Sequence, residues 1–354
     1  MKITIIGLNP NLLPSIFNYG FPSKYFYEAL GDFGYKFTLN CDSEFLIAIN
    51  HNRHNYRKFI ANSKKTSSAC VLIRTEPVSV FPSQYLSHVE KLYGLIISPG
   101  NVEVSDLFHL GYEFQGSDGG PKFQSHNTVE TIQKNMSTGI FSLENWKMRP
   151  FEIVLFGSDK FSPLLKSGYS LRRDLVKVAD TKELLVFGYN WDADFFKRMS
   201  LYLRMTFFHL RNFYFSNLDV SQLRSINSPN IMGESFEKAK TLESSKFTLV
   251  IENSLSTFTE KLFDAMIMGS IPIYVGPNLN RFGIPESTYI SAPPDVSEIR
   301  QIFKQIKDID HSKYLDEIRK FIGSELFAHT WCDKAPYEVI AQKIHEYFSQ
   351  CLAK

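Results

Sequence analysis

The pattern of apolar and polar positions is clearest in the second half of the chain. An apolar run at 247–251 predicts a buried parallel strand, and it ends on the polar residues Glu252 and Asn253. Apolar residues then recur at helical spacing over 262–267. A second apolar run at 271–275 follows directly. Together these segments predict a βαβ unit.

The loop of this βαβ unit carries candidate chemistry. Ligands of open α/β sheets bind at the carboxyl ends of the strands, which is where this loop begins. Thr259 and Glu260 are placed to cap and acidify the start of the helix, and Lys261 lies in its first turn. A cation at a helix amino terminus, where the peptide dipoles already favour an anion, predicts a phosphate site.

Further apolar runs extend the α/β pattern over the whole chain. In the first half they alternate with helical or polar segments and predict a parallel sheet, with strands at Lys2–Ile6, Phe45–Ile49, Cys70–Arg74 and Leu95–Ser98. The second half begins near Phe151, continues with a helix at 169–178 and adds a strand at 184–191. We therefore expect two α/β domains, 1–148 and 149–354, with closing helices at the carboxyl end of the second.

Composition narrows the class of protein. A chain of 354 residues with 44% hydrophobic and 21% charged residues is typical of a globular protein of two domains. The net charge of +2 and the lack of a basic block predict no nucleic-acid partner. Much of the aromatic content, 31 Phe and 17 Tyr, is expected in the cores.

Targeting and cysteine patterns favour the cytoplasm. The four cysteines show no metal-ligand spacing and no disulfide framework, so a reducing compartment is the simplest interpretation. The amino terminus lacks the pattern of a signal peptide, and no apolar run has transmembrane length.

The βαβ unit also resembles the signature of a known family, the α1,3/4-fucosyltransferases. ENS at 252–254, TEK at 259–261, Gly269 and IPIY-GP at 271–277 occur in the order of that signature. The family consists of inverting enzymes of GT-B fold, with two Rossmann-like domains facing across a cleft, that use GDP-fucose. The resemblance implies an acceptor-binding domain at 1–148 and a nucleotide-sugar-binding domain at 149–354. It implies no obligatory metal or cofactor.

Two cations are candidates for the diphosphate. Arg172, in the sequence SLRR, resembles the family's S-x-R element, whose arginine contacts the diphosphate. Its planar fork suits phosphate oxygens. Lys261 of the TEK triplet would join it. A solvated helix face is the alternative for Arg172 or Arg173, because two successive helical residues cannot both point into the cleft, and the register favours Arg172 there over Arg173.

The resemblance also implies residues for the nucleoside. Glu260 would accept hydrogen bonds from the ribose hydroxyls, and Asn253 and Thr259 belong to the same donor-binding set. Glu252 either contacts the donor or holds the loop by accepting backbone N–H bonds. Family members commonly have Tyr two residues before the Thr of TEK, where this chain has Thr257 in a shortened loop. A different nucleotide sugar therefore stays an alternative.

A candidate general base lies in the first half. Glu76 follows an apolar strand and precedes Pro77, which restrains it to extended geometry. It resembles the family glutamate that acts as base, and an exposed loop glutamate is the alternative. Arg74 could pair with Glu76 and would then lower its pKa.

Other polar segments have two interpretations each. Asp192 and Asp194 form a D-x-D triplet, which either holds a divalent metal or, as we expect, caps a helix. His51 and His54 are expected to be surface polar residues. The polar, Gly-rich segment 111–128 is either a functional loop or a plain surface loop. The aromatic and basic segment 195–215 is either a buried helix or a surface that docks on lipid.

Together with these patterns, the resemblance implies an inverting α1,3-fucosyltransferase. It would move L-fucose from GDP-fucose to the hydroxyl of an oligosaccharide or glycolipid acceptor, as in bacterial lipopolysaccharide or O-antigen synthesis, with possible contact to the inner face of the membrane. One alternative is a GT-B transferase with another nucleotide-sugar donor for surface polysaccharide. The other is a non-catalytic glycan-binding protein on the same fold.

Overall fold

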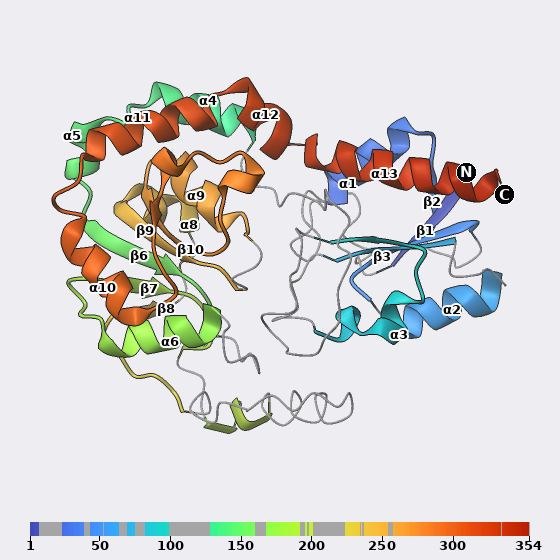
Figure 1. Ribbon diagram of the computed structural model, residues 1–354, viewed down its shortest axis with the longest axis horizontal. Coiled ribbons are helices and arrows are strands. Elements are labelled where there is room, and N and C mark those ends of the chain that lie inside the picture. The colour runs from blue at the N-terminus through green and yellow to red at the C-terminus, as the bar shows by residue number, and fades with distance from the viewer. Residues whose placement is uncertain are drawn as a thin grey trace. The chain divides into compact units, whose positions relative to one another are not determined.

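The chain divides into two compact units. A computed structural model describes residues 1–6, 23–38, 43–51, 53–63, 69–74, 82–98, 128–159, 168–191, 195–196, 198–200, 224–233, 235, 237–253, 258–333 and 335–353. The first unit comprises 1–124 and 329–354, and the second comprises 125–328 (Figure 1).

The first unit is built on a parallel sheet of five strands in the order β2-β1-β3-β4-β5. The strands are β1 (Lys2–Ile6), β2 (Lys36–Thr38), β3 (Phe45–Ile49), β4 (Cys70–Ile73) and β5 (Leu95–Ile97). The helices are α1 (Ser23–Asp32), α2 (Arg53–Ser63), α3 (Ser87–Glu90) and α13 (Ala335–Leu352), with a 3₁₀ turn at Pro82–Tyr85. The four predicted strands are confirmed, and the edge strand β2 was not predicted.

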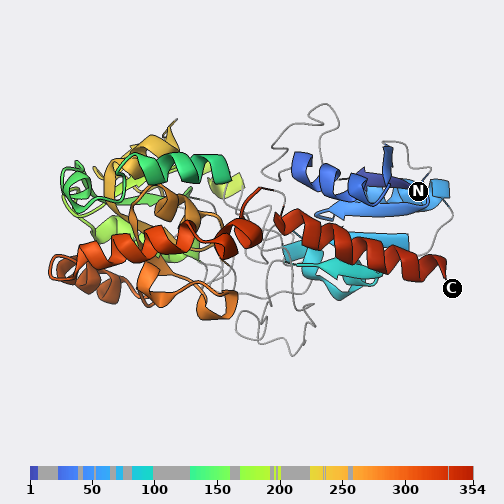
Figure 2. The ribbon, with the colours of Figure 1, turned by 90° about the horizontal axis from the view of Figure 1, so that it is seen from above.

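Helix α13 belongs to the first unit. Its buried face, Tyr337, Ile340, Ile344 and Phe348, packs into the same core as residues of β1, β3 and α1. The ring of Phe348 stacks on that of Phe45 in β3, with centroids 4.0 Å apart. Figures 1 and 2 show α13 next to α1. The sequence predicts that the last helices close the second domain. In the structure, α13 belongs to the first unit instead.

The second unit contains a six-stranded parallel sheet in the order β11-β10-β9-β6-β7-β8. The strands are β6 (Phe151–Phe156), β7 (Leu185–Phe187), β8 (Ile231–Gly233), β9 (Ser245–Ile251), β10 (Ile271–Val275) and β11 (Ile290–Ser291). The helices are α4 (Val129–Ser137), α5 (Leu143–Lys147), α6 (Gly168–Val178), α8 (Lys238–Glu243), α9 (Lys261–Ile267), α10 (Val296–Gln305), α11 (His311–Ile322) and α12 (Glu325–Trp331), which runs into the first unit. Helices cover both faces of this sheet, α9 and α11 on one and α6 and α10 on the other (Figure 1).

Residues 128–148 pack on the second sheet, so the expected boundary at 148/149 lies inside this unit. Arg149 is buried and donates to the carbonyls of Ile140, Ser245 and Gly269, each at 2.8 Å. Trp146 Nε1 donates to the carbonyl of Lys246 at 2.9 Å. These bonds tie α5 to the start of β9. The compact units accordingly separate at 124/125.

In the part of the chain that the structure describes, no helix combines the length and the apolar character needed to cross a membrane.

Candidate functional site

The strand order of the second sheet places the candidate site between β6 and β9. Strands β6, β7 and β8 extend the sheet in one direction, and β9, β10 and β11 extend it in the other, starting from β6. The order therefore reverses between β6 and β9. In doubly wound sheets, ligands bind outside the carboxyl ends of the strands at such a switch point.

Helix α6 approaches this switch point closely. Its first residue, Gly168, lies against the strand end of β9, because a Cβ at position 168 would be 1.7 Å from the carbonyl oxygen of Glu252. The backbone N–H of Gly168 donates to the carbonyl of Asn253 at 3.3 Å. One turn later, Arg172 points to the same strand end.

Arg172 and Lys261 converge on one oxygen atom. Arg172 Nη2 donates to Asn253 Oδ1 at 2.8 Å and also to the carbonyl of Ile251, and Lys261 Nζ donates to the same Oδ1 at 3.4 Å. Arg172 is 1% exposed, and both of these acceptors are neutral oxygen atoms. Its Nε has no hydrogen-bond partner among the described residues.

Glu252 holds the loop between β9 and α9. Its carboxylate accepts the backbone N–H of Thr259 at 2.9 Å and the Thr259 hydroxyl at 2.8 Å, and its Oε2 lies 3.6 Å from Lys261 Nζ. The expected role of Thr259 in capping the helix is therefore wrong, since its side chain bonds Glu252. Of the two roles considered for Glu252, the geometry matches the one in which it accepts a backbone N–H.

Burial acts on the charge of all three ionisable side chains in this cluster. Burial lowers the pKa of Arg172, and burial also lowers the pKa of Lys261, with Arg172 adding to that effect and Glu252 opposing it. Burial raises the pKa of Glu252, against the effects of Lys261 and Thr259. Each charged form is thus disfavoured by desolvation. An anion bound between Arg172 and Lys261 would offset the penalty of these two cations.

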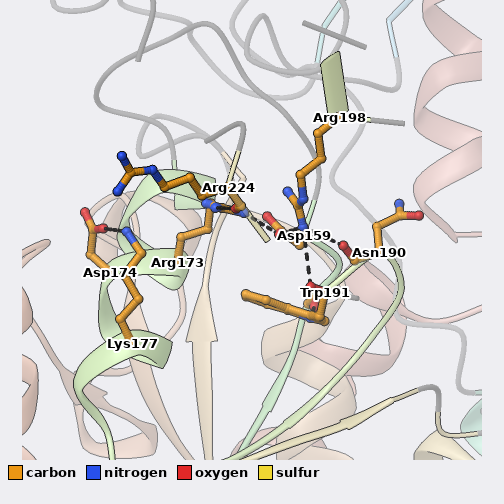
Figure 3. A network of polar contacts seen from close by, with 9 residues as sticks. Asp159, Arg173, Asp174, Lys177, Asn190, Trp191, Arg198 and Arg224 are labelled. Atoms are coloured by element: carbon orange, nitrogen blue, oxygen red, sulfur yellow. Dashed lines mark hydrogen bonds and ion pairs between the residues drawn. The ribbon is translucent and has the colours of Figure 1, made fainter. Parts of the chain in front are cut away.

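A second polar network lies at the carboxyl ends of β6 and β7 (Figure 3). Asp159, three residues after β6, forms ion pairs with Arg173 Nη1 and with Arg198 Nη2, and all three side chains are buried. Arg198 Nη2 also donates to the carbonyl of Asn190 at 2.8 Å. Trp191 Nε1 donates to the carbonyl of Gly157 at 2.7 Å.

This network corrects the expectation for Arg173 and adds residues that the sequence did not indicate. Arg173 is 2% exposed rather than solvated, because it reaches Asp159 while Arg172 reaches Asn253. Asp159 and Arg198 were not predicted. The only signal for Asp159 was its place in GSD directly after an apolar run, and Arg198 stood in a segment typical of a buried helix.

Glu260 immediately precedes α9, where it is the N-cap residue and makes no side-chain capping bond. It is partly exposed. Behind the loop, Lys238 of α8 forms an ion pair with the buried Asp264 of α9. Within the TEK triplet, Lys261 lies beside Asn253 and Thr259 bonds Glu252, and the structure adds the Lys238–Asp264 pair next to them.

In the first unit, Arg74 does have a carboxylate partner. Its Nη2 lies 2.6 Å from Glu90 Oε1 and donates to the carbonyl of Gln84 at 2.7 Å. The guanidinium also lies over the ring of Tyr85, 4.1 Å from its centroid. Glu76 lies outside the described residues, and so do Thr257, Asp192, Asp194 and nearly all of 111–128 and 201–215.

His51 differs from its expectation as a surface residue. It is partly buried, and its Nδ1 lies 2.8 Å from the Tyr93 hydroxyl. Burial lowers its pKa to about 4, helped by His88 and Arg53, so the imidazole is neutral near pH 7. His54 is exposed, as predicted. No group of three or more metal-ligating side chains occurs among the described residues.

Comparison with known proteins defines the fold class. No protein-family model matches the sequence, and no curated protein sequence matches it significantly. Solved structures do match in fold. An α1,3-fucosyltransferase has a TM-score of 0.53 at 13% identity, covering 100% of this chain and 90% of that protein. Sucrose-phosphate synthase from Thermosynechococcus elongatus has a TM-score of 0.52 at 13% identity, covering 100% and 99%.

A third structure, Anabaena HepE in complex with UDP and glucose, has a TM-score of 0.50 at 10% identity, covering 99% of this chain and 100% of that protein. At such identities the similarity concerns the fold. Together with the two parallel sheets, it shows that this chain has the GT-B fold of two Rossmann-like domains.

Proposed function

We propose that the chain is an inverting glycosyltransferase that moves a sugar from a nucleotide donor to a hydroxyl of a glycan acceptor. One observation carries this proposal. Arg172 and Lys261 meet at Asn253 Oδ1 beside the switch point of a GT-B fold, and the described contacts of Arg172 go to neutral oxygens. A buried arginine and a half-buried lysine with one carboxylate between them suit the diphosphate of a nucleotide sugar.

The donor would be held by the loop between β9 and α9. Arg172 and Lys261 would bind the diphosphate and stabilise the negative charge that grows on it as the glycosidic bond breaks. Glu260 would accept hydrogen bonds from the ribose hydroxyls, and Asn253 would orient the donor. Glu252 and Thr259 would support these residues, because their mutual bonds fix the loop.

The acceptor would be activated from the first unit. Glu76 would take the proton of the acceptor hydroxyl while that oxygen attacks the anomeric carbon from the face opposite the diphosphate. The bond to the diphosphate breaks with its electron pair, so the configuration at the anomeric carbon inverts. With GDP-fucose as donor, the β-linked sugar would become an α-fucoside on an oligosaccharide or glycolipid.

The identity of the donor has one specific competitor. The resemblance of ENS, TEK and IPIY-GP supports GDP-fucose, whereas Thr257 replaces the tyrosine that is common in that family. A protein of the same fold, Anabaena HepE, was solved with UDP and glucose. A UDP-sugar transferase for surface polysaccharide is therefore the second candidate.

Calorimetric titration of the protein with GDP, UDP and CMP separates the candidates. We expect GDP to bind most tightly of the three. In a separate transfer assay, we expect the protein to consume GDP-fucose when oligosaccharide acceptors and excess EDTA are present. Tightest binding of UDP would contradict GDP-fucose as the donor and favour a UDP-sugar. Failure to bind any of the three nucleotides would refute the proposal of a glycosyltransferase. Activity lost in EDTA and restored by manganese would assign a metal role to Asp192 and Asp194.

A further inference from the structure

Arg172 and Arg173 are adjacent on α6, both are buried, and they hold two different strand ends. Arg172 bonds the end of β9 through Ile251 and Asn253. Arg173 Nη1 forms an ion pair with Asp159 after β6. The switch point lies between β6 and β9, so the two arginines connect α6 to the strand ends on both of its sides.

These two contacts fix the rotation of α6 about its own axis. Successive residues of an α-helix point about 100° apart, so contacts from Arg172 and Arg173 have different directions around the axis. Gly168, one turn earlier, fixes the distance of the helix from β9 through its close approach to the Glu252 carbonyl. Release of the Arg173 contact removes one of the restraints on the rotation of the helix, so Arg172 is held less firmly at Asn253.

Asp159 has a second cation that does not hold α6. Arg198 Nη2 lies 2.5 Å from Asp159 Oδ2 and bonds the carbonyls of Asn190 and Trp191 in the segment after β7 (Figure 3). Arg173, which does lie on α6, pairs with the same Asp159 and donates from its Nη2 to the carbonyl of Arg224 at 2.5 Å. Removal of either arginine leaves Asp159 with one cation, so the two variants have comparable charge balance.

We propose that Arg173 is a positioning residue for diphosphate binding, acting through its ion pair with Asp159 to hold Arg172 in place. The inference rests on the proposed function, since Arg172 is there assigned to the diphosphate. Arg173 itself does not touch the donor. It acts only by setting the rotation of the helix that carries Arg172.

The test compares Arg173→Gln with Arg198→Gln. Calorimetry measures the affinity of each variant for GDP and for GMP, which lacks the second phosphate. Arg173→Gln is expected to raise the Kd for GDP about tenfold, the cost of one charge-assisted hydrogen bond, and to change the Kd for GMP less. Arg198→Gln is expected to bind both nucleotides as the wild type does. The exposed Asp174→Asn, on the same helix, is the control for nonspecific effects.

Asp159→Asn distinguishes positioning from direct contact. It releases Arg173 without removing it, so GDP binding should weaken as in Arg173→Gln. If Arg173→Gln weakens GDP binding but Asp159→Asn leaves it unchanged or makes it tighter, Arg173 binds the diphosphate itself and the inference is overturned. Equal losses in the two arginine variants, or equal losses for GDP and GMP, would show a structural role only and would also overturn it.

Folding is checked first by thermal unfolding. If a glutamine variant does not fold, Arg173→Lys and Arg198→Lys replace the pair, because lysine keeps the charge but lacks the fork that bridges Asp159 and a carbonyl. The same asymmetry in GDP binding is expected, with smaller losses. A wild type that binds none of GDP, UDP and CMP refutes the proposed function, and this inference with it. A wild type that binds GDP while all variants match it refutes the inference alone.

Discussion

Gly168 and Glu252 are in such close contact that a Cβ at position 168 would lie 1.7 Å from the Glu252 carbonyl oxygen. Gly168→Ala should therefore push α6 away from β9 and carry Arg172 with it. We expect a loss of about 3 kcal/mol in the free energy of unfolding, because a backbone carbonyl cannot move aside as a side chain can. Urea unfolding measures this loss, and nucleotide affinity should fall in parallel.

Gly31→Ala is the matched control for this substitution. Gly31 also lies in a helix, and a Cβ there would meet nothing within 4 Å. The change should leave stability unaltered or raise it by about 0.5–1 kcal/mol through helix propensity. Equal effects of the two substitutions would contradict the close approach of α6 to β9.

Arg149 should be essential to the stability of the second unit. Burial lowers the pKa of Arg149 to about 10, so the guanidinium is still charged near pH 7. It donates hydrogen bonds to the carbonyls of Ile140, Ser245 and Gly269. Arg149→Met would leave these carbonyls without their donor and should cost about 3–5 kcal/mol. Lys147→Met, at an exposed position of the preceding helix, should cost almost nothing. If both variants unfold at the same urea concentration, residues 128–148 do not belong to this unit.

His51 should make the stability of the first unit depend on pH. Its pKa is lowered to about 4, whereas the unfolded value is about 6.5. Between these values the unfolded state binds a proton that the native state does not, so stability falls as pH falls from 6.5 to 4. With its partial exposure allowed for, the loss is about 2 kcal/mol.

His51→Asn should remove this part of the pH dependence, and His54→Asn, at an exposed site, should not. The measurement is the urea midpoint at pH 4.5 and pH 7 for all three proteins. A pH dependence that is the same in His51→Asn and the wild type would show that the imidazole is not buried in its neutral form.

The strands could be predicted because they are nearly continuous apolar runs. Every position of β3, β4 and β10 is buried, and such a pattern is visible without any tertiary information. The edge strands β2 and β8 are short and partly exposed, so they leave no comparable pattern. Helix α13 has a recognisable apolar face, but an apolar face does not specify which of two sheets it covers.

The candidate site could be predicted in two ways: within one βαβ unit from residues that are neighbours in sequence, and for Arg172 from the resemblance of SLRR to the family's S-x-R element. Asn253 and Lys261 belong to one βαβ unit, and their proximity follows from the loop between them. The burial of Arg173 depends on Asp159, which lies 14 residues away after another strand. The helical period indicated that the two adjacent arginines point in different directions. It did not indicate that Arg173, like Arg172, has a partner of its own, which is Asp159.

Glu76 should be required for catalysis and not for donor binding. Glu76→Gln keeps the shape of the side chain and removes its basicity, so kcat should fall by about 100- to 10,000-fold while the Kd for GDP is unchanged. Glu44→Gln, at an exposed position of the same unit, is the control. Full activity of Glu76→Gln in a transfer assay would mean that another residue accepts the proton.

The most direct test of the whole account is a crystal structure of the protein with GDP. The account predicts the diphosphate beside the carboxyl ends of β6 and β9, with the Arg172 guanidinium and the Lys261 ammonium within about 3.2 Å of its oxygen atoms. GDP bound elsewhere, or a diphosphate that contacts neither Arg172 nor Lys261, would contradict it.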